Sequence, residues 1–321
     1  MSRRAFLAAG AALAACQTAP PMSAAPGLAP SLGTASASAV SSTVTVDGVP
    51  MHLSRTGRGR PVCLIHGASG NLNDMTFRLG PALADRFEVI AIDRPGHGWS
   101  GVPSGGSVSI NAQAALIRGA LDQLGIERPI VVGHSYGGAV ALAWAVDAPG
   151  TMSALVLLAA PSQVWEGGLG LTNDLLASPV TGPPLAHAIP HLVTRGFADR
   201  TLRSVFDPQE VPAGYLDHLG LDLVLRPESL RENARQLVAL KEELRPMIPS
   251  YPDLSMPIRL VHGDADRTVG LDIHSAPFAR QVPQAGLTRL PGIGHMIHQV
   301  ATARAIEAVD AVTRQPSGIR P

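Results

Sequence analysis

Short, continuous apolar runs recur along the chain at wide intervals. The runs occupy residues 62–65, 89–92, 130–132, 155–158, 258–261 and 287–290. Runs of this length without polar alternation are typical of strands that are buried on both faces of a parallel sheet. Ahead of them, residues 43–46 alternate, Asp47-Gly48 indicates a turn and residues 51–53 continue the pattern. This first stretch predicts an antiparallel hairpin that leads into the sheet.

Helical periodicity fills the intervals between these runs. Residues 110–124 carry apolar side chains on one face and stop at Gly125, a residue type that commonly ends helices. Residues 297–312 have a similar spacing and predict a last helix. Because strands alternate with helices, we expect an α/β fold built on a mostly parallel, doubly wound sheet.

Residues 161–252 interrupt this alternation. The segment is rich in proline and has several short apolar stretches, but no run that looks like a parallel strand. Its clearest helical pattern covers residues 228–244. Because so long a segment without secondary structure would be improbable in a compact domain, we interpret it as a helical lid packed over one end of the sheet. The core is then predicted at residues 43–160 and 253–321.

Composition and charge exclude several classes of protein. The chain has 321 residues with 25 Lys+Arg and 25 Asp+Glu, which gives a formal net charge of zero. No basic excess is left to neutralise phosphates, so we expect no nucleic-acid partner. A hydrophobic content of 45% excludes disorder throughout the chain. The two cysteines cannot form a disulfide framework.

The first residues have the pattern of an export signal. Arg3 and Arg4 precede a short apolar run that ends at Cys16. The paired arginines resemble a twin-arginine signal, and the end of the run resembles a bacterial lipobox. This resemblance implies a signal peptide at residues 1–15, a lipidated Cys16 that binds the membrane surface, and an exported protein on the periplasmic or cell-envelope side. A cleaved signal that merely contains a cysteine is the alternative. Residues 16–42 are uncharged and rich in Ala, Ser and Pro, which predicts a flexible tether.

The strongest chemical motif follows the apolar run at 130–132. Residues 133–137 read Gly-His-Ser-Tyr-Gly, and a predicted helix covers residues 139–146. This is the G-x-S-x-G pattern of a nucleophile elbow, with the strand before it and the helix after it that the motif requires. The glycines leave space where strand and helix meet, and the helix start directs backbone N–H groups toward developing negative charge.

Four further loops follow other apolar runs. They read HGASG at residues 66–70, DRPGHGWS at 93–100, GDADRTV at 263–269 and GIGH at 292–295. With the elbow, these loops resemble the α/β-hydrolase fold superfamily, in its lid-bearing serine hydrolase or esterase type, over residues 43–313. The insertion shares with that superfamily only the presence of a lid.

The resemblance assigns a role to individual residues. It implies a triad in the chain order Ser135, Asp266 and His295, as nucleophile, acid and general base. Asp264 competes with Asp266 for the role of the acid, and the family spacing G-x-x-D-x-x-V favours Asp266. The backbone N–H groups of Ala68 and Tyr136 are expected to form the oxyanion hole.

This triad predicts acyl transfer on a small-molecule substrate. We expect hydrolysis of carboxylic esters through an acyl-enzyme, because esters have better leaving groups than amides. No Cys/His grouping has zinc-ligand spacing and no phosphate loop or dinucleotide fingerprint occurs, so we expect neither a metal nor a cofactor. Other reactions on the same triad remain open: an aminopeptidase, a carbon–carbon bond hydrolase or a cofactor-free perhydrolase. A non-catalytic surface-binding protein on this scaffold and a lipid-tethered structural protein are the alternatives from other classes.

Overall fold

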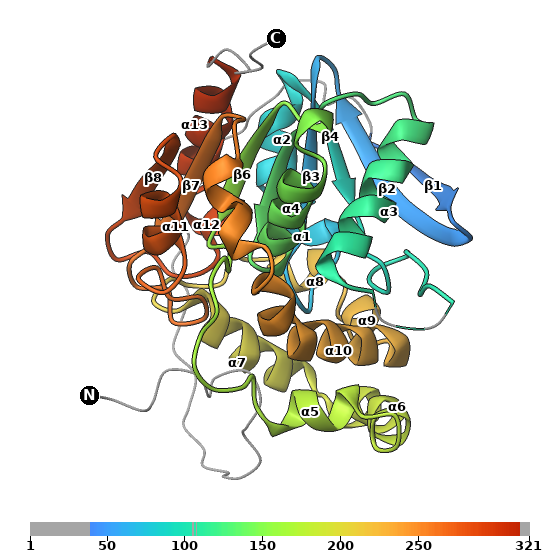
Figure 1. Ribbon diagram of the computed structural model, residues 1–321. Helices are drawn as coiled ribbons and strands as arrows, with labels where there is room; N and C mark the ends of the chain where they lie inside the picture. Colours follow the sequence, from blue (N-terminus) through green and yellow to red (C-terminus); the bar gives the residue numbers. More distant parts are fainter. Residues whose placement is uncertain (1–38, 105, 107, 315–321) are drawn as a thin grey trace, which may run out of the picture.

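The computed structural model describes residues 39–104, 106 and 108–314 (Figure 1). An eight-stranded sheet runs through this part of the chain in the order β1-β2-β4-β3-β5-β6-β7-β8. The strands are β1 (Val40–Val46), β2 (Val49–Gly57), β3 (Arg60–Ile65), β4 (Phe87–Ile92), β5 (Ile130–His134), β6 (Ala154–Leu158), β7 (Ile258–Gly263) and β8 (Ala285–Leu290). The predicted mostly parallel, doubly wound sheet is confirmed, since all neighbours from β4 to β8 pair in parallel.

The two antiparallel pairings lie at the first edge of the sheet. β1 pairs with β2 across a tight turn in which Asp47 and Gly48 both have positive φ, at 50° and 79°. This turn geometry suits the twist of a hairpin and explains the Asp-Gly pair. β2 then pairs antiparallel with β4. β1 begins at Val40, which pairs with Arg55, so the ordered sheet starts earlier than the predicted core boundary at residue 43.

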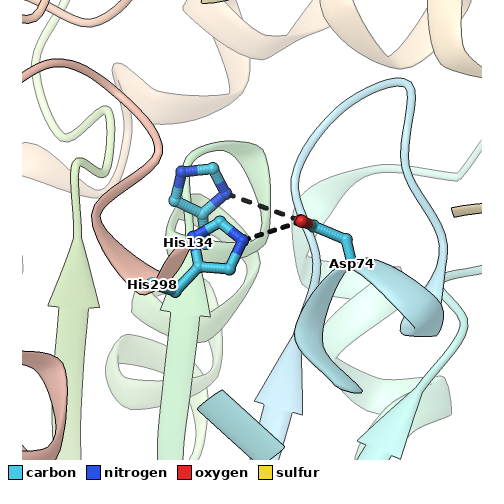
Figure 2. Close-up of side chains that lie close together, drawn as sticks. All are labelled: Asp74, His134 and His298. Atoms are coloured by element: carbon cyan, nitrogen blue, oxygen red, sulfur yellow. Dashed lines mark hydrogen bonds and ion pairs between the residues drawn. The ribbon is translucent and has the colours of Figure 1, made fainter. Parts of the chain in front are cut away.

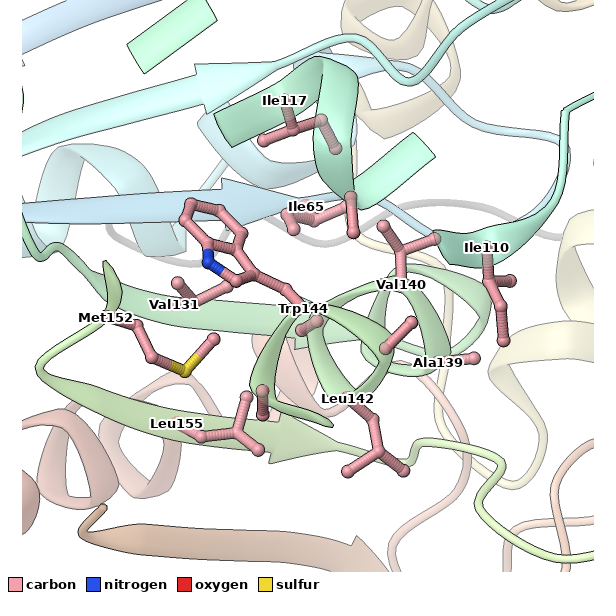
Figure 3. Close-up of a cluster of buried hydrophobic side chains, with 14 of the residues drawn as sticks. Ile65, Ile110, Ile117, Val131, Ala139, Val140, Leu142, Trp144, Met152 and Leu155 are labelled. Carbon is pink, nitrogen blue, oxygen red and sulfur yellow. The ribbon is translucent and has the colours of Figure 1, made fainter. Parts of the chain in front are cut away.

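Helices cover both faces of the sheet and create two apolar clusters. On one face lie α3 (Ile110–Gln123) and α4 (Tyr136–Asp147), with the short η1 (Pro149–Thr151) and α11 (Ser275–Gln281). Figure 3 shows part of this cluster, where Trp144 of α4 is buried and its indole N–H donates to Thr151 Oγ1 at 2.7 Å. The opposite face is covered by α1 (Leu72–Thr76), α2 (Leu79–Ala84), α12 (Ile297–Val300) and α13 (Thr302–Thr313).

The last helix differs from the prediction of one element over residues 297–312. Two helices, α12 and α13, meet at Ala301, whose φ of −133° and ψ of 41° are not helical. The periodicity survives the break because apolar residues of both helices face the sheet. Thr302 Oγ1 donates to the carbonyl of His298 at 2.9 Å, which compensates a backbone group at the end of α12.

The chain between β6 and β7 folds into helices that lie below the sheet in Figure 1. They are α5 (Leu171–Ala177), α6 (Gly182–Leu192), α7 (Arg195–Phe206), α8 (Tyr215–Leu219), α9 (Leu221–Val224) and α10 (Pro227–Leu244). The segment then ends in the 3-10 helix η2 (Ile248–Asp253), which packs on the sheet face that α4 and α11 cover. α10 begins at a proline, which suits a first helical position because its missing N–H would have no partner there. Among the helices of the described residues, none combines the length and apolar character needed to cross a bilayer.

Candidate active site

Ser135 occupies a sharp turn between β5 and α4. Its φ of 51° and ψ of −124° are unfavourable for a residue with a Cβ, so the surrounding fold must impose this conformation. The glycines beside it allow the turn. A Cβ on Gly133 would come within 2.3 Å of the Gly137 carbonyl oxygen, and one on Gly137 within 2.3 Å of the Ile65 carbonyl oxygen. β5 and α4 therefore cross at close range, and the chain turns sharply at Ser135 between them.

Asp266 and His295 form a buried pair at the ends of β7 and β8. Asp266 Oδ2 lies 2.8 Å from His295 Nδ1, while Oδ1 accepts the backbone N–H groups of Thr268 at 2.8 Å and Val269 at 2.9 Å. His262 Nε2 lies 3.2 Å from the same Oδ2. Burial alone would raise the pKa of Asp266, but the charges and hydrogen bonds of His295 and His262 hold it well below its usual range.

Asp264 has a different environment, although it is only two residues away. Its Oδ1 accepts the backbone N–H of Gly292 at 2.7 Å, and the residue is exposed, whereas Asp266 is buried. Of the two candidate acids, the structure therefore brings Asp266 to His295 and uses Asp264 to hold the turn before His295.

Ser135 and His295 both lie at the covered end of the sheet, with 9% and 3% of their surface exposed. The pairing of Asp266 with Nδ1 leaves Nε2 of His295 available to a hydroxyl. Between residues 39 and 314, no hydrogen bond joins the Ser135 hydroxyl to His295. Hydrogen bonds of this kind are often long before substrate binds and tighten in the reacting complex.

The loop after β3 passes beside Ser135. A Cβ on Gly67 would come within 3.2 Å of Ser135 Cβ, so only a glycine fits there comfortably. Ala68 follows in this loop, and Tyr136 is the first residue of α4. Within the described part of the chain, neither the Ala68 nor the Tyr136 backbone N–H donates to a protein acceptor. Two free donors next to a strained serine are what an oxyanion hole requires.

A second buried carboxylate–imidazole cluster lies behind the elbow (Figure 2), and only its His134 belongs to a sequence motif. Asp74 Oδ1 lies 2.8 Å from His298 Nε2, and His134 Nδ1 lies 3.9 Å from Asp74 Oδ2. His134 Nε2 in turn donates to the His295 carbonyl oxygen at 3.1 Å. The cluster therefore connects α1 and α12 to the backbone of His295.

The same three side chains have the composition of a metal site, with ligand atoms within 4.8 Å of one another. However, Asp74 Oδ1 already accepts from Tyr215 at 2.7 Å, from His298 and from Gln299 Nε2 at 3.1 Å. With Oδ1 engaged in this way, we interpret Asp74 and His298 as a hydrogen-bonded link between α1 and α12, against which His134 packs without a hydrogen bond from its Nδ1.

The cavities show how the site is covered. A cavity of about 820 Å³ lies among α6, α8, α9 and the start of α10, and Ser135, Asp266 and His295 do not line it. A cavity of only about 20 Å³ lies between the loop after β3 and α10. Asn233 of α10 closes that gap, since its Oδ1 accepts the Ser69 N–H at 2.6 Å. Beneath these helices Ser135 keeps only 9% of its surface exposed.

Comparisons with known proteins agree with this arrangement. A family profile described as alpha/beta hydrolase fold matches residues 60–301. The chain is 32% identical over 250 residues to a magnesium-chelatase 30 kDa subunit of Rhodobacter capsulatus, covering 76% of this chain and 83% of that protein. It is 27% identical over 253 residues to a 2-hydroxy-6-oxo-6-phenylhexa-2,4-dienoate hydrolase of Burkholderia cepacia, covering 76% and 84%. Among solved structures, Cfl2 of Burkholderia cenocepacia aligns with a TM-score of 0.71 at 23% identity, over 85% of this chain and 95% of that one.

Proposed function

Because the chain is a hydrolase that belongs to the α/β-hydrolase fold family, we propose that it cleaves carboxylic esters through an acyl-enzyme on Ser135. The observation that carries the proposal is the geometry of two elements. Ser135 stands in a strained elbow after β5 with φ of 51°, and the buried Asp266–His295 pair at 2.8 Å follows β7 and β8 at the same edge of the sheet. This geometry supports Ser135 as the nucleophile, His295 as the base and Asp266 as the group that orients the base.

The proposal assigns a residue to each step. His295 Nε2 removes the proton from Ser135 Oγ as that oxygen attacks the ester carbonyl carbon. The resulting oxyanion accepts hydrogen bonds from the Ala68 and Tyr136 N–H groups. The tetrahedral intermediate then expels the alcohol, which takes the proton from His295. Water repeats the sequence on the acyl-enzyme and releases the acid, while Asp266 stabilises the imidazolium in both halves.

A second candidate is hydrolysis of a carbon–carbon bond in a dienoate substrate. The similarity to the dienoate hydrolase of Burkholderia cepacia over 76% of this chain favours it. The same serine, base and oxyanion donors would serve both reactions, because the elbow does not itself select the leaving group. Both candidates therefore share their site and differ in the substrate.

A chain-length series of p-nitrophenyl esters tests the first candidate. We expect hydrolysis by the purified protein and a loss of roughly 10³-fold or more in Ser135→Ala. Ser250→Ala, in η2, is the matched control and should keep wild-type activity. Hydrolysis that persists in Ser135→Ala would reject the proposed nucleophile. Absent ester hydrolysis together with turnover of a 2-hydroxy-6-oxo-dienoate would instead favour the second candidate.

The helices between β6 and β7 would act as a lid in this proposal. Two observations support that role: Ser135 is only 9% exposed, and Asn233 of α10 binds the loop after β3. Weakening that contact by Asn233→Ala should increase access, which would raise the rate with bulky esters more than the rate with the acetyl ester.

We also propose that the protein is exported and anchored to the membrane surface through Cys16. The support is the residue pattern at the start of the chain, with Arg3 and Arg4 ahead of the apolar run. Cys16 and the rest of residues 1–38 lie outside the described residues. Metabolic labelling with palmitate should mark the wild type and leave Cys16→Ser unlabelled; equal labelling of both proteins would reject the anchor.

A further inference from the structure

Arg94, in the loop after β4, is a fully buried cation without a carboxylate partner in the described chain. Its guanidinium donates to four neutral oxygens: the His66 carbonyl at 3.1 Å, the Gly67 carbonyl at 3.0 Å, Gln113 Oε1 at 3.1 Å and Gln236 Oε1 at 2.6 Å. The charge is therefore hydrogen-bonded and not neutralised.

A charge in this position is costly. Burial lowers the pKa of Arg94 to about 10, which still leaves the side chain charged at neutral pH. The adjacent carboxylate of Asp93 is engaged elsewhere, since it accepts from the Leu72 N–H at 2.7 Å and the Trp99 N–H at 2.9 Å and contacts His52. An unneutralised buried cation is useful where negative charge develops nearby.

The Gly67 carbonyl links Arg94 to the proposed oxyanion hole. Its C=O belongs to the same peptide group as the Ala68 N–H, and in a trans peptide the two bonds point in opposite directions. The carbonyl accepts from Arg94 Nη2 at 3.0 Å and also from His66 Nδ1 at 2.8 Å. Two donors on one side of this peptide fix its orientation and polarise the N–H that emerges on the other side.

Arg94 also contacts the residue that carries the second donor. Its guanidinium carbon lies 4.4 Å from the centre of the Tyr136 ring. Gln113 connects the same two residues, because its Oε1 accepts from Arg94 and its Nε2 lies 3.2 Å from the Tyr136 hydroxyl. Arg94 thus contacts both the Gly67–Ala68 peptide and the Tyr136 side chain, which belong to the two proposed oxyanion-hole donors.

We propose that Arg94 is a positioning residue for the oxyanion hole. It orients the hole through the Gly67–Ala68 peptide and the Tyr136 ring, and its positive charge stabilises the oxyanion electrostatically. The inference rests on the proposed serine-hydrolase function. A purely structural role predicts a different outcome, since neutralising an unpaired buried charge should then be harmless or stabilising.

The rate at which a fluorophosphonate probe labels Ser135 tests this role, because phosphonylation places an oxygen in the oxyanion hole and needs no known substrate. We expect Arg94→Met to slow labelling by about 100-fold, the loss that is typical of one oxyanion donor. Arg94→Lys keeps the charge and should recover part of the rate. Arg304→Met, on the surface, should label like the wild type.

Gln236 offers a test that preserves Arg94 itself. Gln236→Glu places a carboxylate against the guanidinium and should slow labelling about 10-fold. Gln236→Met removes the same hydrogen bond without adding charge and should slow it less. If both variants are folded and label equally fast, or if Gln236→Glu matches the wild type, the electrostatic role is wrong. If the wild type is not labelled at all, or Ser135→Ala is labelled equally, the proposed function fails and the role of Arg94 falls with it.

Discussion

Asp266 and Asp264 show how two residues with the same side chain acquire different tasks. Both oxygens of Asp266 are engaged inside the protein, by His295 and His262 on one side and by two backbone N–H groups on the other. Asp264 contacts only a turn. The environment of each aspartate is therefore set by the groups within hydrogen-bond distance of its oxygens.

The first prediction compares these two aspartates. Asp266→Asn should lower kcat for ester hydrolysis by roughly 10³–10⁴-fold, because an amide no longer stabilises the imidazolium and favours the wrong tautomer of His295. Asp264→Asn should lower it by less than about 10-fold. Steady-state kinetics on both variants, with circular dichroism to confirm folding, decides the matter. Equal losses in both variants would show that Asp266 is not the sole acid partner of His295.

The buried Asp74 predicts a stability effect. Removing its charge leaves His298 and Tyr215 with a weaker acceptor inside the protein, so Asp74→Asn should lower the free energy of unfolding by about 3 kcal/mol. Asp272→Asn, whose carboxylate pairs with Arg289 at the surface, should change it by less than about 1 kcal/mol. Urea titrations of both variants measure the difference. Equal small changes would show that the cluster does not support the fold.

At the scale of elements, the crossing of β5 and α4 leaves no space for a side chain. A methyl group on Gly133 would meet the backbone of Gly137 at 2.3 Å, and backbone atoms cannot move aside as a flexible side chain can. We expect Gly133→Ala to lower the free energy of unfolding by about 3 kcal/mol and to displace Ser135. Gly150→Ala, with no atom within 4 Å of the added methyl, is the control and should be nearly neutral. Thermal unfolding of both variants checks this; similar melting temperatures would mean that the crossing can widen.

Elements whose pattern is local in the sequence were predicted better than elements that depend on distant contacts. The buried strands could be predicted because each is a continuous apolar run. The Asp47-Gly48 turn could be predicted from its own two residues. The break between α12 and α13 was missed because apolar spacing continues across Ala301. The short helices α5 to α9 could be predicted only as a helical segment, since helices of four to twelve residues depend on what they pack against.

At the scale of the whole molecule, the topology brings distant residues together. Ala68, Ser135, Asp266 and His295 each follow a different parallel strand, and the ends of these strands meet at one edge of the sheet. Motif positions predicted these residues at one edge of the sheet, where the structure places Asp266 Oδ2 within 2.8 Å of His295 Nδ1. Asp74 and His298 carry no comparable signal, because their contacts come from burial and from partners far away in the sequence. Arg94 lies in the DRPGHGWS loop, but that motif does not reveal its partners Gln113 and Gln236.

Acid stability is the last prediction, and it belongs to the whole molecule because buried histidines lie on several elements. Burial lowers the pKa of His97 to about 3 and that of His274 to about 4, so the folded state keeps both neutral. Between pH 6.5 and 4 the unfolded chain binds protons that the folded chain does not, and stability must fall as pH falls through this window. For His274 alone the loss amounts to about 3 kcal/mol.

Urea titrations at pH 7.5 and 4.5 should show this loss of stability. His274→Gln should reduce the pH dependence, whereas the control His191→Gln, at an exposed position, should leave it unchanged. A stability that is equal at both pH values would mean that these imidazoles can be protonated in the folded protein.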